Sequence, residues 1–353
     1  MSGRADRLVA LLDERGLDCL LVSHLVNVRW LTGFTGTNGA CLVSRNERLF
    51  FTDFRYVDLA KSQVREFELV QAGREMLDDL ARRLSGRTGF DDAHVSVRTH
   101  EKLTAKLPEG VELMGAGGLV ERLRAVKDDA EVRAMHAAAQ IADAAYADIR
   151  ERGLAGRSER EVGLTAVRFM EDAGAEGPAF PPIVAAAENG ARPHAVPRRA
   201  EIPRDTLVVV DMGAVVDGYC SDCTRTFATG SVGDEALEVY GLVRATQSKA
   251  RDAVRAGAVC REVDAVARDA IAAAGHGEHF GHGLGHGVGL EVHEDPRLAR
   301  SVEGSLEAGN TVTVEPGIYL PGRFGVRIED LVVVTDEGCR SLTAFPKELV
   351  TIA

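Results

Sequence analysis

The sequence lacks any apolar run long enough to cross a membrane. Its longest runs, such as residues 18–23, fall far short of the roughly 20 residues that a spanning helix needs. It also lacks a signal peptide, because the polar segment of residues 1–7 leads into no apolar stretch with a small-residue cleavage site. The six cysteines are scattered along the chain. Without an export signal, such cysteines are typical of reduced core residues, so we expect a cytoplasmic protein.

Basic residues are also fewer than acidic residues. The chain has 42 Lys and Arg residues against 54 Asp and Glu residues, a formal net charge of −12. This balance argues against a surface that binds nucleic acid or an anionic membrane. Hydrophobic residues make up 45% of the chain and charged residues 27%, which is ordinary for a folded globular protein. A length of 353 residues suggests two domains.

The pattern of expected elements changes along the chain. Over the first third, short apolar strands such as residues 19–22 and 48–52 alternate with helical stretches, which is typical of an α/β domain built on one sheet. After a charged stretch at residues 122–129, strands come in local pairs and helices stand apart, which indicates an α+β domain with an antiparallel sheet. We therefore expect an α+β protein with domains at residues 1–122 and 127–353.

The first of two expected hairpins in the second domain carries two carboxylates. Asp217-Gly218 is a strong signal for a two-residue turn. A turn centred there places Asp222 opposite Gly213, and Asp211 lies two residues further along the same strand. Because strand side chains alternate between faces, Asp211 and Asp222 are expected on one face as diagonal neighbours.

The second expected hairpin repeats this arrangement. A turn centred on Arg323 places Glu329 opposite Gly317, with Glu315 as its diagonal neighbour on the same face. The shared face survives any even shift of register. Buried carboxylates without partners would cost several kcal/mol or take up protons. Four of them lining one pocket suit two divalent ions about 3.5–4 Å apart.

A histidine run interrupted by glycine lies between the hairpins. Five of the ten histidines fall within residues 276–293, and glycine occupies every second position from 281 to 289. This spacing argues against a helix and favours an extended, closely packed backbone. It excludes a helical His-x-x-x-His zinc site, and no Gly-x-Gly-x-x-Gly dinucleotide loop fits. His282 and His286 share a face of an extended chain, so one could bind a metal and the other could face a substrate.

Five strings of the second domain occur together in a known order and spacing. They are Val210-Asp211-Met-Gly213, Ser221-Asp222-Cys-Thr-Arg225-Thr-Phe227, Gly285-His286-Gly-Val-Gly-Leu290 followed by Val292-His293-Glu294, Val314-Glu315-Pro-Gly317, and Arg327-Ile-Glu329-Asp330. In these strings the chain resembles the pita-bread metallopeptidase superfamily, which includes Xaa-Pro aminopeptidase, prolidase, methionine aminopeptidase and creatinase. Its first domain resembles the creatinase-type N-terminal domain, which points to the proline-specific branch. The resemblance implies an α/β creatinase-like domain followed by a pita-bread catalytic domain.

The resemblance also implies the residues of the site. The five metal ligands of the family fall on Asp211, Asp222, His286, Glu315 and Glu329. The resemblance further implies that His282, His293 and His194 lie beside the substrate and that Arg327 orients Glu329 and other ligating carboxylates. It implies two divalent ions, Mn²⁺, Co²⁺ or Zn²⁺, of which the carboxylate-rich ligand set favours Mn²⁺.

The reaction that the resemblance implies is hydrolysis of the peptide bond before proline in short peptides. Two ions would share a water and lower its pKa, so that hydroxide forms near neutral pH and attacks the carbonyl carbon. Glu315 would take the water proton and pass it towards the proline nitrogen. His293 would stabilise the oxyanion, and His282 and His194 would position the substrate. The resemblance also implies a homodimer.

The Xaa-Pro hydrolase could be of two kinds, and two alternatives to it stay open. An Xaa-Pro aminopeptidase, which acts on longer peptides, and an Xaa-Pro dipeptidase differ in what closes the far side of the pocket, and the general likeness of the N-terminal domain favours the aminopeptidase. A creatinase-like C–N hydrolase needs no metal, and the intact set of five ligands weighs against it. A catalytically inactive pita-bread protein used as a binding module usually loses ligands, and this chain keeps them.

Overall fold

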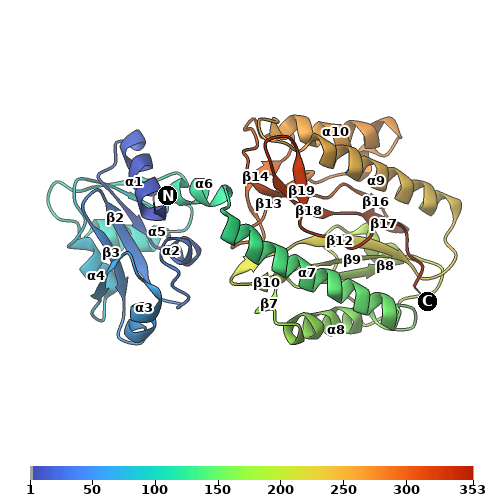
Figure 1. Cartoon of the computed structure of the whole chain (residues 1–353), viewed down its shortest axis with the longest axis horizontal. Coiled ribbons are helices and arrows are strands. Elements are labelled where there is room, and N and C mark those ends of the chain that lie inside the picture. The colour runs from blue at the N-terminus through green and yellow to red at the C-terminus, as the bar shows by residue number, and fades with distance from the viewer. Residues whose placement is uncertain (1–2, 353) are drawn as a thin grey trace. The chain divides into compact units, whose positions relative to one another are not determined.

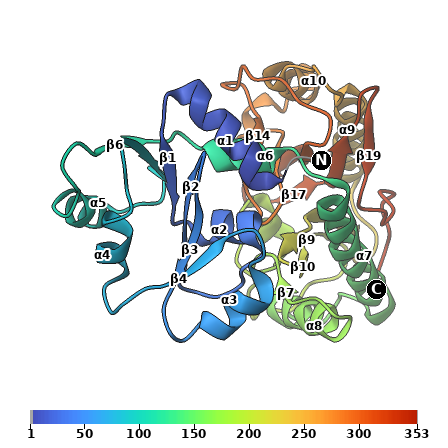
Figure 2. The ribbon, with the colours of Figure 1, turned by 60° about the vertical axis from the view of Figure 1, so that its left-hand side comes forward.

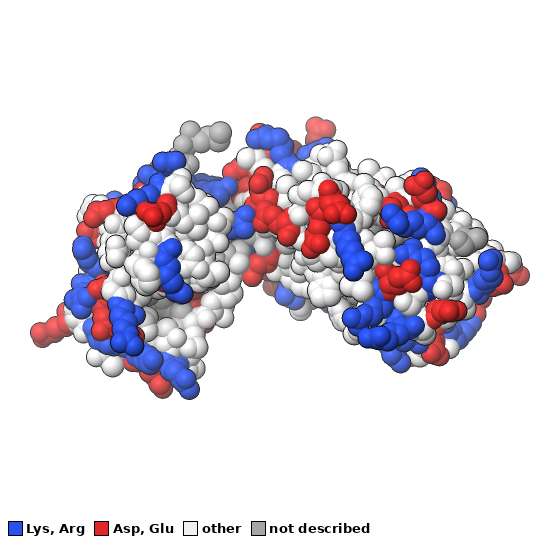
Figure 3. Space-filling view, turned by 90° about the horizontal axis from the view of Figure 1, so that it is seen from below, with Lys and Arg blue, Asp and Glu red and all other residues white. Residues whose placement is uncertain are grey.

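The computed structural model describes residues 3–352. Contacts divide the chain into two compact units, Met1–Arg124 and Ala125–Ala353 (Figure 1). Among the described residues, no helix is both long enough and apolar enough to cross a bilayer. Acidic and basic side chains are intermixed on the face drawn in Figure 3.

The first unit is a six-stranded mixed sheet with the strand order β4-β3-β2-β1-β5-β6. Its strands are β1 (Cys19–Val22), β2 (Ala40–Ser44), β3 (Arg48–Thr52), β4 (Glu68–Gln71), β5 (Arg87–Phe90) and β6 (Glu112–Gly115). Its helices are α1 (Arg4–Arg15), α2 (Leu25–Thr32), α3 (Val57–Gln63), α4 (Met76–Ala81), α5 (Val97–Thr104) and α6 (Leu119–Ala125). The predicted strands at residues 19–22 and 48–52 are confirmed as β1 and β3.

Helices cover both faces of this sheet (Figure 2). Helices α4 and α5 pack against one face, where Leu80 and Leu103 join a core cluster with Leu21 and Leu42. Helices α1 and α2 contact β1 and β2 from the other side. Strand β1 is buried along its whole length, which explains why its sequence is continuously apolar rather than alternating.

The second unit contains small sheets in which every pairing between named strands is antiparallel, as predicted. Its strands are β7 (Gly177–Pro178), β8 (Ile183–Ala186), β9 (Leu207–Met212), β10 (Ala214–Val216), β11 (Tyr219–Cys220), β12 (Cys223–Ala228), β13 (Gly285–Gly287), β14 (Glu294–Leu298), β15 (Thr311–Val314), β16 (Gly317–Leu320), β17 (Phe324–Arg327), β18 (Asp330–Val334) and β19 (Cys339–Ser341). Its helices are α7 (Asp129–Arg152), α8 (Glu159–Asp172), α9 (Asp234–Ala253) and α10 (Cys260–Ala273), with short 3₁₀ turns at Ala187–Ala191 and Gly277–His279.

The strands of this unit lie between two pairs of helices (Figure 1). Helices α9 and α10 share one core cluster with β15 and β18, and α7 and α8 share another with β8, β9 and β12. Helix α7 begins where Asp128 accepts hydrogen bonds at 2.9 Å from the amides of Ala130 and Glu131, which is a strong N-cap. The α+β class expected from the sequence is confirmed.

Candidate metal centre

The first pair of carboxylates lies at the end of β9 and just before β12. The strands pair Asp211 with Thr224 and Met212 with Cys223, which is the register that the turn at 217–218 predicts. Gly213 permits the strands to come together here, because a Cβ atom at this position would lie 1.8 Å from the carbonyl oxygen of Ser221.

The second pair follows β15 and β17, in a register that differs from the predicted one. Strands β16 and β17 pair Leu320 with Phe324, so the turn is centred on Gly322, one residue before the predicted centre. The amide of Arg323 donates to the carbonyl oxygen of Leu320 at 3.0 Å, so Gly322, with a φ of +73°, occupies the position of a β-turn where type II geometry requires a positive φ. Glu329 therefore lies opposite Glu315 rather than diagonal to it. The shift is even, so the two carboxylates still share a face.

The glycine-rich run supplies the imidazole. His286 lies on β13 between β14 and β15, and a Cβ atom on Gly285 would lie only 2.0 Å from the carbonyl oxygen of Thr313. The extended, closely packed backbone predicted for this run is confirmed. His286 Nδ1 lies 3.0 Å from the carbonyl oxygen of Gly287, which can only accept, so Nδ1 carries the proton.

This tautomer turns the Nε2 lone pair of His286 towards the carboxylates. Nε2 lies 3.2 Å from Glu315 Oε1 and 3.7 Å from Asp222 Oδ2. Both oxygens are acceptors, so the three atoms fit together only with a cation or a proton between them.

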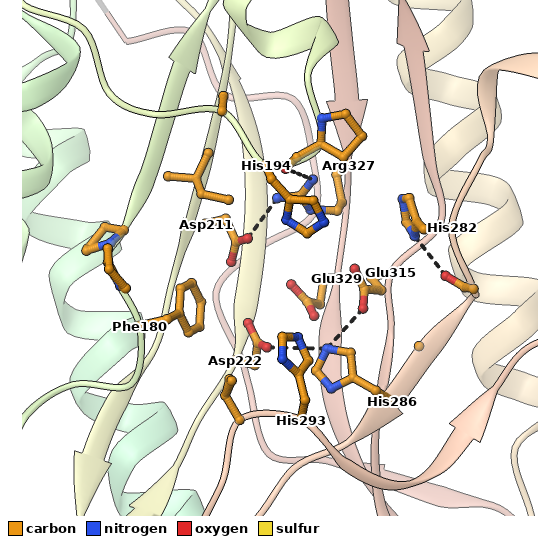
Figure 4. Close-up of a pocket in the computed structure, with 18 of the residues that line it drawn as sticks. Phe180, His194, Asp211, Asp222, His282, His286, His293, Glu315, Arg327 and Glu329 are labelled. Atoms are coloured by element: carbon orange, nitrogen blue, oxygen red, sulfur yellow. Dashed lines mark hydrogen bonds and ion pairs between the residues drawn. The ribbon is translucent and has the colours of Figure 1, made fainter.

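A cavity of about 620 Å³ brings all the predicted site residues together (Figure 4). One ligand atom of Asp222, one of His286 and one of Glu329 lie within 4.8 Å of one another. Asp211 Oδ1 is buried and accepts no hydrogen bond from any described residue. An unpartnered buried carboxylate oxygen is expected of a metal ligand. Carboxylate oxygens with one imidazole suit a hard or borderline divalent ion, so these residues fit the metal that the sequence predicts.

The pKa values of the cluster also fit a bound cation. Burial, and then the charges of the neighbouring carboxylates, raise the pKa values of Asp222 and Glu329 well above their usual range. Burial also raises the pKa of Asp211, although Arg327 opposes this. Burial would raise the pKa of Glu315 as well, but a protonated His286 donates from Nε2 to Glu315 and lowers that pKa to about 2. Without a cation, these raised pKa values favour the protonated forms of Asp222 and Glu329.

The stability of the metal-free protein should depend on pH through these carboxyl groups. A carboxyl group with a raised pKa in the folded state stabilises the fold below its unfolded pKa, and this contribution is lost as the pH rises through the folded pKa. We expect metal-free wild-type protein to lose stability relative to Asp222→Asn as the pH rises above about 4, the usual pKa of an aspartate. Urea unfolding of both proteins in EDTA measures this difference. Parallel curves of stability against pH would contradict it.

Arg327 connects several of these groups. Its guanidinium donates to Asp211 Oδ2 at 2.7 Å, to Thr224 Oγ1 at 3.0 Å and to the Tyr319 hydroxyl at 2.8 Å. Thr224 in turn donates to Glu329 Oε2 at 2.7 Å. The direct contact is therefore with Asp211, whereas Glu329, which we expected Arg327 to orient, is reached only through Thr224.

The three other predicted histidines also line the cavity (Figure 4). His282 Nε2 lies 3.0 Å from the Tyr319 hydroxyl, and its Nδ1 donates to the carbonyl oxygen of Gly283 at 2.8 Å. The ring of His293 packs edge-on against that of His286, with 4.4 Å between centroids. Burial lowers the pKa values of both His282 and His293, which favours their neutral forms. His194 lines the cavity with an exposed side chain.

Sequence reasoning missed three side chains of the site. Tyr319 is four residues from Glu315, and strand alternation alone would have indicated a shared face. Thr224 stands opposite Asp211 in the predicted register, so its hydroxyl could also have been anticipated. Arg297 lines the cavity from β14 and forms no ion pair with any described residue. Nothing in the local sequence indicates this position.

A buried ion pair on α10 holds the backbone beside His282. Arg268 donates twice to Asp264 at 2.7 Å, and also to the carbonyl oxygens of Phe280 at 3.0 Å and His282 at 2.8 Å. Asp264 Oδ1 accepts from the amide of Leu284 at 3.0 Å. The pair therefore fixes the segment that leads from α10 to β13.

We expect Arg268→Met to lower the free energy of unfolding by about 3–5 kcal/mol, because it leaves the fully buried Asp264 carboxylate without its cation. Arg261→Met is the matched control, since Arg261 lies on the same helix in an exposed pair with Glu303 and should change stability by about 0–1 kcal/mol. Equal effects in chemical denaturation would contradict the role given to Arg268.

Comparisons with known proteins identify the family of the chain. The family model described as metallopeptidase family M24 matches residues 133–336, and the creatinase/prolidase N-terminal domain matches residues 4–126. The solved Xaa-Pro dipeptidase from Bacillus anthracis is 40% identical, with a TM-score of 0.96 over 99% of each chain. The X-Pro aminopeptidase from Thermotoga maritima is 33% identical, with a TM-score of 0.91 over 99% of this chain and 100% of that one. The Xaa-Pro dipeptidase of Pyrococcus horikoshii is 33% identical over 99% of both chains.

These matches cover both units and confirm the resemblance found in the sequence. The chain belongs to metallopeptidase family M24, in the form that carries a creatinase/prolidase N-terminal domain.

Proposed function

We propose that this protein is a metal-dependent hydrolase of the peptide bond that precedes proline in short peptides. The observation that supports this most is a set of four carboxylates, three buried and Glu315 half-buried, beside one imidazole, with Asp211 Oδ1 accepting no hydrogen bond from any described residue. Two divalent ions, with Mn²⁺ favoured over Co²⁺ or Zn²⁺, would be held by Asp211, Asp222, His286, Glu315 and Glu329. When bound, such ions act as Lewis acids and lower the pKa of water.

The chain's own residues would move the proton and position the substrate. Glu315 accepts the proton of the attacking water and passes it to the proline nitrogen, which carries no hydrogen in the substrate. His293 stabilises the developing oxyanion as a hydrogen-bond donor. His282 and His194 position the peptide, and Arg327 holds Asp211 in its ligating orientation.

The cavity also suggests how a proline substrate would be recognised. Phe180, Pro181, Pro193 and Val196 give its wall an apolar surface on which a proline ring can pack. Arg297 is a cation in the same cavity and could pair with the carboxylate of a C-terminal proline. In an Xaa-Pro dipeptide the free carboxylate is on the proline itself, so such a pair would favour a dipeptide substrate.

We therefore propose an Xaa-Pro dipeptidase, although the sequence alone favoured an aminopeptidase. The names of the relatives from B. anthracis and P. horikoshii support the dipeptidase. The name of the T. maritima protein supports an aminopeptidase as the second candidate.

Protein stripped with EDTA and then supplied with Mn²⁺, Co²⁺ or Zn²⁺ tests these proposals on Ala-Pro, Ala-Pro-Ala and Ala-Ala-Ala. We expect Mn²⁺ to restore cleavage of Ala-Pro. Cleavage of Ala-Pro-Ala would indicate the aminopeptidase. Equal cleavage of Ala-Ala-Ala would reject proline specificity, and activity that survives full metal removal would favour the creatinase-like alternative.

The proposed organisation is a homodimer of chains with domains at residues 1–122 and 127–353, acting in the cytoplasm. Truncation to residues 127–353, followed by light scattering and kinetics, examines the role of the N-terminal domain. If dimer formation and turnover were unchanged, the N-terminal domain would contribute neither to the dimer interface nor to the active site.

A further inference from the structure

We propose that the first unit holds a separate metal site, formed by His24, His94 and Glu121, that binds a divalent transition-metal ion such as Zn²⁺. His24 directly precedes α2, His94 lies between β5 and α5, and Glu121 lies on α6. Each side chain offers one ligand atom, and the three atoms lie within 4.8 Å of one another. This triad shares no residue with the carboxylate cluster, so the proposal does not depend on the proposed peptidase activity.

The separations within the triad suit a small ion. Ligand atoms that lie about 2.1 Å from a tetrahedral zinc ion are about 3.4 Å apart. His94 Nε2 and Glu121 Oε1 are 3.5 Å apart, which is close to this spacing. The imidazoles of His24 and His94 stack with 3.5 Å between centroids and 6° between planes, so their in-plane lone pairs run parallel and one ring must turn before both can bind one ion.

The buried residue Asp91 accepts hydrogen bonds from the backbone at both histidines. Asp91 Oδ2 accepts hydrogen bonds from the amides of Ser23 at 2.6 Å and His24 at 2.8 Å. The carbonyl oxygen of Asp91 accepts from the amide of His94 at 3.0 Å. The two ligands are thus held in place by the same residue, which limits the ordering that an ion would have to impose.

Two buried side chains orient the carboxylate of Glu121. Asn27 donates from its amide to Glu121 Oε1 at 2.6 Å, and Arg124 donates to Asn27 Oδ1 at 2.7 Å. Asn27 and Arg124 are 0% and 2% exposed. Outer hydrogen bonds of this kind commonly orient metal ligands and tune their affinity.

Two imidazoles and one carboxylate select the class of ion. This donor set suits Zn²⁺, Co²⁺ or Ni²⁺ and disfavours Mg²⁺ and Ca²⁺, which prefer oxygen ligands. Three protein ligands leave at least one coordination position for water. The competing occupant of this site is a proton on His94, which would form an ion pair with Glu121.

The test counts zinc in the full-length chain. Wild-type protein, His94→Ala, Glu121→Gln and His100→Ala are incubated with excess Zn²⁺, desalted and measured by inductively coupled plasma mass spectrometry. His100 is the matched control, because it lies in the same unit with its ring against Phe90, outside the triad. Circular dichroism establishes that each variant is folded.

We expect His94→Ala and Glu121→Gln each to retain one zinc ion fewer per chain than wild type, and His100→Ala to match wild type. The difference is expected whether or not the carboxylate cluster also takes zinc. Equal zinc contents in wild type and His94→Ala would overturn the proposal and leave the proton as the occupant. A zinc-edge anomalous peak beside His24, His94 and Glu121 in crystals of the wild type would support it independently.

Discussion

Glu315→Gln is expected to reduce kcat on Ala-Pro by at least about 1,000-fold in the Mn²⁺-supplied protein. The substitution removes a positioned proton acceptor, which is typically worth 10²–10⁴-fold, and it also replaces an ionic ligand by a neutral amide. The amide nearly preserves the shape of the side chain and can still accept from the Thr313 hydroxyl, which lies 3.1 Å from Glu315 Oε1. The loss of activity should therefore occur without loss of the fold.

Glu307→Gln is the matched control, because Glu307 is exposed and outside the cavity. This variant should keep wild-type turnover. Circular dichroism and thermal unfolding of both variants establish that the fold is intact. A folded Glu315→Gln protein with near-normal kcat would remove Glu315 from the proton transfer.

Asp222→Asn is expected to lower metal content below that of wild type and to reduce kcat/KM by at least about 100-fold at limiting Mn²⁺. The pKa of Asp222 is raised by burial and by the charges of Glu329, Asp211 and Glu315, so its ionised form depends on a neighbouring cation. A neutral amide removes both the charge that attracts the ion and the repulsion that the ion offsets. The variant should therefore gain little thermal stability when Mn²⁺ is added, whereas wild type should gain much more.

Asp217→Asn is the matched control for this substitution. Asp217 is exposed in the turn of the same hairpin, with a φ of +51°, and asparagine is well suited to that position. Metal content by mass spectrometry and melting temperature with and without Mn²⁺ should match wild type in this control. An Asp222→Asn protein that binds metal as wild type does would exclude Asp222 from the ligand set.

Much of the arrangement of the candidate site was predictable because its elements are local. The Asp217-Gly218 turn fixes the register in which Asp211 pairs with Thr224. The alternation of side chains along the strands then places Asp211 and Asp222 on the same face. The glycine run around His286 likewise predicts close backbone packing. This is confirmed at Gly285, where an added Cβ atom would lie 2.0 Å from the carbonyl oxygen of Thr313. The second hairpin was placed one residue late, although Pro321-Gly322 is typical of the two central positions of a type II turn and Gly322 is the residue with a positive φ.

Contacts between distant segments could not be predicted in this way. Arg268 reaches the carbonyl oxygen of His282 only because α10 packs beside the loop that follows it. His24, His94 and Glu121 are separated by up to 97 positions and meet through the sheet order of the first unit. Such pairings depend on tertiary packing, about which hydrophobic periodicity carries no information.

Anomalous diffraction at the manganese edge from crystals soaked in Mn²⁺ tests the central claim most directly. We predict two peaks about 3.5–4 Å apart in the cavity, contacted by Asp211, Asp222, His286, Glu315 and Glu329. If the cavity holds no peak at full Mn²⁺ saturation, these five side chains do not form a metal centre and the proposed chemistry is wrong.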